Sequence, residues 1–275
     1  VLIIIGLFRK VMIGDTAGRY VDHIFDDLSL YKSIEIVFAV VLFSIQIYAD
    51  FSGYSHIARG TSKLLGVELV KNFEQPYLSR NISEFWRRWH ISLSSFLKDY
   101  LYIPLGGNRV KSRMSINLMI TMLLGGLWHG ANWNFMIWGG LHGLYLLIHK
   151  VFIQKNIEPK NHSKLNSSLS TLFTFILVTF TWLFFRSQTI ESTTIIFNKI
   201  WYWEHSEYSV EFIKIAITYL SLIGFLDITE AKYGHTGILK LKSKMIIIGT
   251  LSALFFVTLA YMFQADVSPF IYFQF

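Results

Sequence analysis

The chain has 275 residues, of which 53% are hydrophobic and only 16% are charged, and its formal net charge is +7. Soluble domains carry roughly 25% charged residues, so this composition excludes an ordinary soluble protein and predicts an integral membrane protein. The absence of cysteine excludes a disulfide framework, a thiolate metal site and a thioester intermediate on the protein.

Apolar stretches along the chain come close to the roughly 20 residues that a membrane-spanning helix needs. They cover residues 34–49, 132–148, 168–185, 212–226 and 245–263. The glycine-rich stretch 115–128 is shorter and predicts a broken or re-entrant element. We therefore predict an all-α integral membrane protein, a multi-span helical bundle with interfacial and re-entrant helices, as a single domain over residues 1–275.

The basic residues are concentrated in a few segments. Ten of the 25 Lys and Arg residues lie between Asp50 and Arg113, and further lysines lie in the segments 150–167 and 227–244. Segments rich in Lys and Arg stay in the cytoplasm, so we expect these three on that side and the C-terminus outside. Because the basic residues flank apolar spans and alternate with aromatic ones, they favour contact with the lipid bilayer over nucleic acid, and we predict no nucleic-acid partner.

The stretch YADFSGYSHIARGTSKLLG, residues 48–66, places Asp50 at the end of an apolar span that already contains Glu35 and Gln46. Polar side chains at helix ends usually face water or cap a neighbour, and this interpretation is favoured for Asp50. We expect His56 to lie in a loop.

The segment NISEFWRRWHISLSSFLKDYLYIPLGGNR, residues 81–109, predicts one interfacial helix. Asn81 or Ser83 would cap its start, and its aromatic and apolar residues recur at helical spacing, namely Phe85, Trp89, Leu93, Phe96 and Tyr100. His90 and Ser94 lie one turn apart, but no G-x-S-x-G motif or acidic third member supports a serine nucleophile. Arg87, Arg88 and Lys98 could attract an anionic acyl donor, although ordinary interfacial anchoring is an equal alternative.

No histidine spacing indicates a metal site. The motif H-E-x-x-H is absent, and so is any pair of histidines four residues apart. His142 and His149 share a helical face but have no carboxylate nearby. We predict no metal ligands.

The stretch LLGGLWHGANWNFMIWGGLHG, residues 123–143, places two histidines in an apolar environment. Gly125, Gly126 and Gly130 surround His129, and ANWN interrupts the helical pattern, so His129 is predicted at the tip of a broken hairpin facing a cavity. A neutral imidazole there could accept a proton from an alcohol as its oxygen attacks an acyl carbonyl. The alternative is a structural histidine with satisfied hydrogen bonds.

These motifs resemble the membrane-bound O-acyltransferase family. The similarity is strongest to the bacterial branch that contains alginate O-acetyltransferase, and the teichoic acid D-alanyl transfer protein is more distant. The resembling stretches are GLFRKVMIGDTAGRYVD, YADFSGYSHIARG, NFEQPYLSRNISEFWRRWHISLSSFLKDYLYIPLGGNR, NLMITMLLGGLWHGANWNFMIWGGLHG, TWLFFR and the terminal FIYFQF. The resemblance implies tilted transmembrane helices around a central catalytic tunnel, and it implies that this sequence is the C-terminal part of a longer chain whose N-terminal spans are missing.

The resemblance also implies roles for individual residues. The family's catalytic histidine lies in the motif that here reads GGLWHGANW, so this role falls on His129. A second family histidine maps to His90, on the cytoplasmic side where the donor arrives. The remaining candidates are predicted to bind substrate: Trp128, Asn132, Arg87 and, as a supporting pocket residue or else a packed histidine, His142.

The predicted function is therefore an O-acyltransferase, most simply an O-acetyltransferase, in the bacterial cytoplasmic membrane. It would move an acyl group from acetyl-CoA or an acylated carrier protein, without a bound cofactor, to hydroxyls of an extracytoplasmic polysaccharide. Periplasmic or extracellular acetylation proteins are the expected partners. The alternatives are a transporter or channel subunit for a polysaccharide or small molecule, with His129 in a proton relay, and an inactive scaffold subunit.

Overall fold

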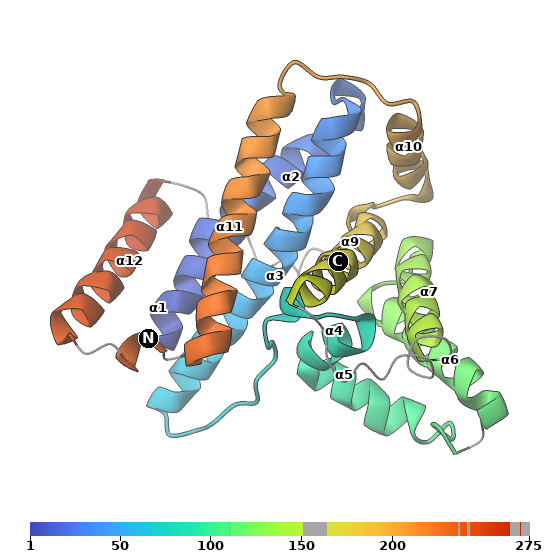
Figure 1. The fold of residues 1–275 in the computed structure, drawn as a ribbon, viewed down its shortest axis with the longest axis horizontal. Helices are drawn as coiled ribbons and strands as arrows, with labels where there is room; N and C mark the ends of the chain where they lie inside the picture. The colour runs from blue at the N-terminus through green and yellow to red at the C-terminus, as the bar shows by residue number, and fades with distance from the viewer. Residues whose placement is uncertain (110, 151–163, 236, 241–242, 265–269, 271–275) are drawn as a thin grey trace. The chain divides into compact units, whose positions relative to one another are not determined.

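The computed structural model describes the chain except residues 110, 151–163, 236, 241–242, 265–269 and 271–275 (Figure 1). Within the described residues the secondary structure is helical, with no strand, which confirms the all-α prediction. The helices form two compact units. The first combines Val1–Lys71 with Ile195–Phe275, and the second is Asn72–Thr194.

Four helices in the described part of the chain are long and apolar enough to cross a membrane. They are Ser33–Leu64, Leu165–Arg186, Ser209–Tyr233 and Lys244–Phe263, and each contains one of the predicted apolar stretches. The remaining stretch, 132–148, forms the 16-residue helix α7 (Trp133–Ile148), which is not among these spans. At 1.5 Å per residue α7 is about 24 Å long, shorter than the roughly 30 Å hydrocarbon core.

In the first unit, a nearly continuous helical run packs along one long helix. The run comprises α1 (Leu2–Leu7), the π-helix η1 (Phe8–Asp15) and α2 (Thr16–Asp26), and its partner is α3 (Ser33–Leu64). Gly6 and Gly53 allow the close approach, since a Cβ on either residue would lie 2.7 Å from the carbonyl oxygen of the other. The core between these helices is apolar and includes Ile13, Ala17, Val21, Ile36, Ala39 and Leu42.

The C-terminal helices complete the first unit. The short helix η2 (Leu28–Leu30) connects α2 to α3. The C-terminal part of the unit begins within α10 (Ile190–Trp201), where Lys199 donates a hydrogen bond to the carbonyl oxygen of Tyr31. Helix α11 (Ser209–Tyr233) packs on α3, and after η6 (Gly237–Lys240) helix α12 (Lys244–Gln264) packs on α1 and η1.

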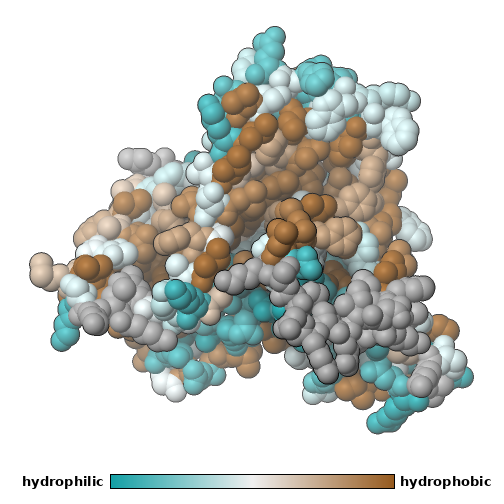
Figure 2. Space-filling view, viewed as in Figure 1, coloured by the Kyte–Doolittle hydropathy of each residue, from teal (hydrophilic) through white to brown (hydrophobic). Residues whose placement is uncertain are grey.

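Apolar side chains on the outer faces of α11 and α12 remain exposed, among them Ile217, Phe225, Ile228, Ile246, Ile248 and Phe256. Figure 2 shows hydrophobic residues over the middle of α3 and α11 and hydrophilic residues near their upper ends. Exposed apolar surface of this extent is typical of helices that face lipid.

The long helix α3 corrects the prediction for Asp50. The helix continues to Leu64, so Asp50 lies in its interior rather than at its end. The carboxylate is 3% exposed and forms an ion pair with Lys10 Nζ at 3.0 Å. It therefore neither faces water nor caps a helix, because a cation from η1 replaces water as its partner.

In the second unit, the single helix predicted within residues 81–109 is instead two short α-helices and a π-helix. After the turn η3 (Pro76–Leu78), α4 (Ile82–Arg88) and α5 (Ile91–Leu97) are separated at Trp89 and His90, and the π-helix η4 (Lys98–Tyr102) follows. The break has a nonlocal cause, since the Glu74 amide donates to the carbonyl of Arg88 and the Ile91 amide donates to that of Asn72. The cap prediction is confirmed at Asn81, whose side chain accepts from the amide of Glu84 at 2.8 Å.

The hairpin predicted around His129 is confirmed. Helix α6 (Lys111–His129) is continuous, so the interruption falls after residue 129 and not within 115–128, and α7 starts at Trp133. Asn132 caps α7 by accepting from the amide of Asn134. The helices pack closely at a glycine pair, since a Cβ on Gly126 would lie 2.2 Å from the Phe135 carbonyl oxygen and one on Gly139 would lie 2.3 Å from that of Met122. Helix α9 (Lys164–Arg186) packs against α7.

Several predictions stay predictions. They concern the tunnel, the membrane topology and the organisation as a single domain. Lys155 and Lys160 of the expected cytoplasmic loop and most of the terminal stretch FIYFQF lie outside the described residues.

Candidate functional site

His129 is the last residue of α6, where the chain leaves the helix for the break at residues 130–132. Its half-buried ring is surrounded by aromatic rings of the second unit. The ring centroids lie 5.0 Å from Trp128, 5.2 Å from Trp138 and 5.0 Å from Phe185. The imidazole therefore lies against aromatic rings at the tip of a helical hairpin, as a base that reacts away from bulk water would require.

His90 lies in the break between α4 and α5. Its backbone is left-handed, with φ of 42°, a conformation that is uncommon for residues other than glycine and costs about 1 kcal/mol or more. The side chain is only 8% exposed, and burial lowers its pKa to about 4, so the imidazole is neutral at pH 7. Its Nδ1 lies 3.4 Å from Ser92 Oγ.

The expected neighbour of His90, Ser94, has a different partner. Ser94 Oγ donates to the carbonyl oxygen of Trp89 at 3.0 Å. This geometry does not support a Ser94–His90 nucleophile pair.

Trp128 brings the two candidate catalytic histidines together. Its ring lies 6.3 Å from that of His90 and 5.0 Å from that of His129, in edge-on contacts, and the side chain is 58% exposed. Arg87 is exposed in the last turn of α4. Both residues are accessible, and their predicted substrate-binding roles stay predictions.

His142 is fully buried, and both of its ring nitrogens have partners. Trp86 Nε1 donates to Nδ1 at 3.2 Å, and Nε2 lies 2.9 Å from Thr181 Oγ1. The Thr181 hydroxyl donates to the carbonyl of Val178, so it accepts from Nε2–H, and this network assigns the tautomer. The geometry favours the packed, structural alternative for His142.

Asn132 is also engaged in structural contacts. Besides capping α7, its side-chain amide donates to the carbonyl oxygen of Gln188 at 2.7 Å. These bonds fix the turn after His129 to the residues that follow α9, so Asn132 shapes the site whether or not it also contacts a substrate.

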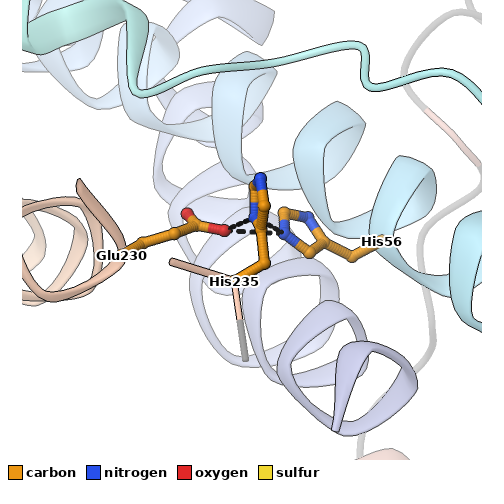
Figure 3. Close-up of side chains that lie close together, drawn as sticks. All are labelled: His56, Glu230 and His235. Carbon is orange, nitrogen blue, oxygen red and sulfur yellow. Dashed lines mark hydrogen bonds and ion pairs between the residues drawn. The ribbon is translucent and has the colours of Figure 1, made fainter. Parts of the chain in front are cut away.

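Two features were not predicted from the sequence. The first is the set of buried aromatic residues from α7 and α9 beside His129. Part of this set lies in the stretch TWLFFR, which could have indicated it. The second lies in the first unit, where His56, Glu230 and His235 converge (Figure 3). His56 is a buried residue of α3, so its assignment to a loop was wrong. His56 and Glu230 are separated by 174 positions in the sequence, so no short-range motif could indicate the cluster.

The apolar spans and the all-α architecture define a multi-pass α-helical membrane protein. Residues 14–185 match the model of MBOAT, the membrane-bound O-acyltransferase family, and the chain belongs to this family. The matched region contains His90, His129 and His142, the histidines singled out in the sequence.

Named relatives come from several bacteria. The chain is 44% identical over 189 residues to a peptidoglycan O-acetyltransferase of Helicobacter pylori, a match that covers 68% of this chain and 36% of that protein. It is 36% identical over 293 residues to a probable alginate O-acetylase of Pseudomonas putida, covering 98% of this chain and 59% of the relative. A teichoic acid D-alanyltransferase of Bacillus subtilis is 28% identical over 186 residues, covering 65% of this chain and 46% of the relative. The chain thus spans only part of the length of these relatives.

Proposed function

We propose that the chain belongs to a membrane O-acyltransferase that transfers an acetyl group from a cytoplasmic donor to hydroxyls of an extracytoplasmic polysaccharide. The observation that carries this proposal is the position of His129, at the tip of the α6–α7 hairpin, against aromatic rings and within the family-matched region. The names of the relatives support acetyl transfer to an envelope polymer.

In the proposed reaction His129 acts as general base. It accepts the proton of the acceptor hydroxyl while the hydroxyl oxygen attacks the carbonyl carbon of the donor thioester. The carbon–sulfur bond then breaks, and the proton passes to the departing thiolate of coenzyme A or a carrier protein. The products are the ester and a free thiol. Direct transfer fits better than a covalent acyl-enzyme, since this chain has no cysteine and the geometry does not support a Ser94–His90 nucleophile pair.

His90 is proposed to position the donor. Its neutral ring shares the Trp128 contact with His129, and the exposed Arg87 lies on the preceding helix, where it would attract an anionic donor. We expect His90→Ala to lower transfer severely and to raise the donor concentration needed for half-maximal rate. Unchanged dependence on donor concentration would reject this role.

The proposal includes a location and partners. We place the protein in the bacterial cytoplasmic membrane, with the basic segments in the cytoplasm and the acceptor polysaccharide on the other side. Periplasmic or extracellular acetylation proteins would complete delivery to the polymer.

The experiment follows isotope-labelled acetyl groups in a strain that lacks the gene and in the same strain carrying the complete gene. Mass spectrometry of surface polysaccharides should show labelled O-acetyl esters that disappear with the gene and return with it. A transporter that exports the polysaccharide would leave the ester content per sugar unchanged. That result would refute the proposal.

A further inference from the structure

Three potential metal-ligating side chains of the first unit point toward one another in Figure 3. His56 comes from α3, Glu230 from the end of α11, and His235 from the turn that follows α11. His56 Nε2 lies 3.0 Å from Glu230 Oε1 and 3.0 Å from His235 Nδ1, and the last two atoms are also in contact. The ligand atoms all lie within 4.8 Å of one another.

The hydrogen bond between His56 and the backbone determines which of its ring nitrogens carries the proton and which directs a lone pair at this cluster. His56 Nδ1 lies 2.6 Å from the carbonyl oxygen of Ser52, which only accepts, so Nδ1 carries the proton. In the neutral ring Nε2 is then an acceptor. This is the arrangement by which metal-binding histidines are usually oriented, with the second nitrogen donating to a backbone carbonyl.

The two partners of His56 also present lone pairs. The Glu230 carboxylate only accepts hydrogen bonds, and its Oε1 is in contact with His235 Nδ1. In the tautomer with its proton on Nε2, the His235 ring directs the lone pair of Nδ1 at the cluster. In that tautomer three lone pairs converge on one point, the arrangement in which side chains bind a metal ion.

Glu230 is held in position by a buried network. Its Oε2 accepts from Arg9 Nη2 at 2.8 Å, and Arg9 is also paired with Asp227 at 2.9 Å. Tyr48 donates to the same Asp227 oxygen at 3.0 Å. Arg9 is thus shared by the two carboxylates, and its bond to Oε2 holds Glu230 with Oε1 against the two histidines.

We propose that His56, Glu230 and His235 form a binding site for one divalent transition-metal ion of the zinc class. Two imidazoles and one carboxylate are ligands typical of zinc and iron(II), whereas calcium and magnesium prefer all-oxygen sites. Zinc bonds of about 2.0–2.1 Å imply ligand separations of about 3.3 Å in a tetrahedron, so two of the three pairs need to open by only a few tenths of an ångström. A fourth position would be open to water or another ligand.

Such an ion would tie α3 to the turn that follows α11 within the first unit. The site does not involve the histidines proposed for acyl transfer, so it can be tested independently of that function. The ion would bind the folded arrangement, which brings together ligands distant in sequence, and would stabilise it.

The test uses the complete protein purified in detergent, stripped with a chelator and titrated with Zn²⁺ against a fluorescent zinc indicator. We expect one Zn²⁺ per chain, with a rise in the thermal unfolding midpoint on binding. Glu230→Gln and His235→Gln should each weaken zinc binding by about tenfold or more. His205→Gln, which alters an exposed histidine of the same unit, should leave it unchanged.

Two results would overturn the proposal. One is the absence of saturable one-to-one zinc binding by the wild-type protein. The other is binding by His235→Gln as tight as that of the wild type. Because His235 lies in a turn rather than inside a helix, its variant keeps the test decisive even if a change at the buried His56 prevents folding.

Discussion

The close packing of α6 on α7 makes a sharp prediction for Gly139. A methyl group at this position would lie 2.3 Å from the carbonyl oxygen of Met122, whereas real Cβ atoms are essentially never found closer than 3.0 Å to such an atom. In Gly139→Ala the obstructing atom belongs to the backbone, so the two helices must separate by at least about 0.7 Å.

The size of the effect follows from this displacement. Overpacking of a well-packed interface costs about 1–3 kcal/mol, so the thermal unfolding midpoint should fall. The hairpin also carries His129 at its tip, and misplacing a catalytic group by about 1 Å costs on the order of a hundredfold in rate. We therefore expect Gly139→Ala to lower acyl transfer by tenfold or more.

The adjacent residue provides a matched control. In Gly140→Ala the new methyl group would lie 3.5 Å from Leu123 Cδ2, an ordinary van der Waals contact. Both variants would be purified in detergent and compared by thermal unfolding and by transfer of labelled acetyl groups. If Gly139→Ala matched Gly140→Ala in both assays, the inferred helix packing would be refuted.

Further predictions concern the other histidines of the second unit. Thr181→Val should cost about 1–3 kcal/mol because it leaves His142 Nε2 buried without a hydrogen-bond partner, whereas Thr174→Val, in the same helix, should cost less. Equal unfolding midpoints would contradict the His142–Thr181 hydrogen bond. The pKa of His90 is about 4 in the folded protein and about 6.5 in the unfolded chain, so the unfolded chain binds the proton at a higher pH. The free energy of unfolding should therefore fall as the pH drops from about 6.5 to about 4, by on the order of 3 kcal/mol. His90→Gln should flatten that part of the stability curve, and an unchanged slope would show that burial of this imidazole is not its source.

Sequence patterns predicted the features that depend on local chemistry. The apolar spans follow from composition, the cap at Asn81 from its side-chain oxygen, and the break after His129 from Gly130 and the stretch ANWN. In each case the residues that determine the structure are neighbours in the chain.

The features that could not be predicted depend on distant partners. The left-handed His90 is stabilised by backbone bonds to the segment around Asn72, which helical periodicity does not report. Asp50 stays inside a helix because Lys10 pairs with it, and His56 is buried because Glu230 and His235 lie against it. Residues that are polar by sequence are thus satisfied by contacts that form only in the folded chain.

The central claim is that His129 is the general base of acyl transfer, and His129→Gln tests it most directly. The complete protein carrying this change, or His205→Gln as control, would be expressed in the strain that lacks the gene, with membrane levels matched by quantitative detection. Loss of a general base should lower the O-acetyl content of surface polysaccharide by at least about a hundredfold, while the control keeps it. Wild-type acetylation by His129→Gln at equal protein levels would contradict the account.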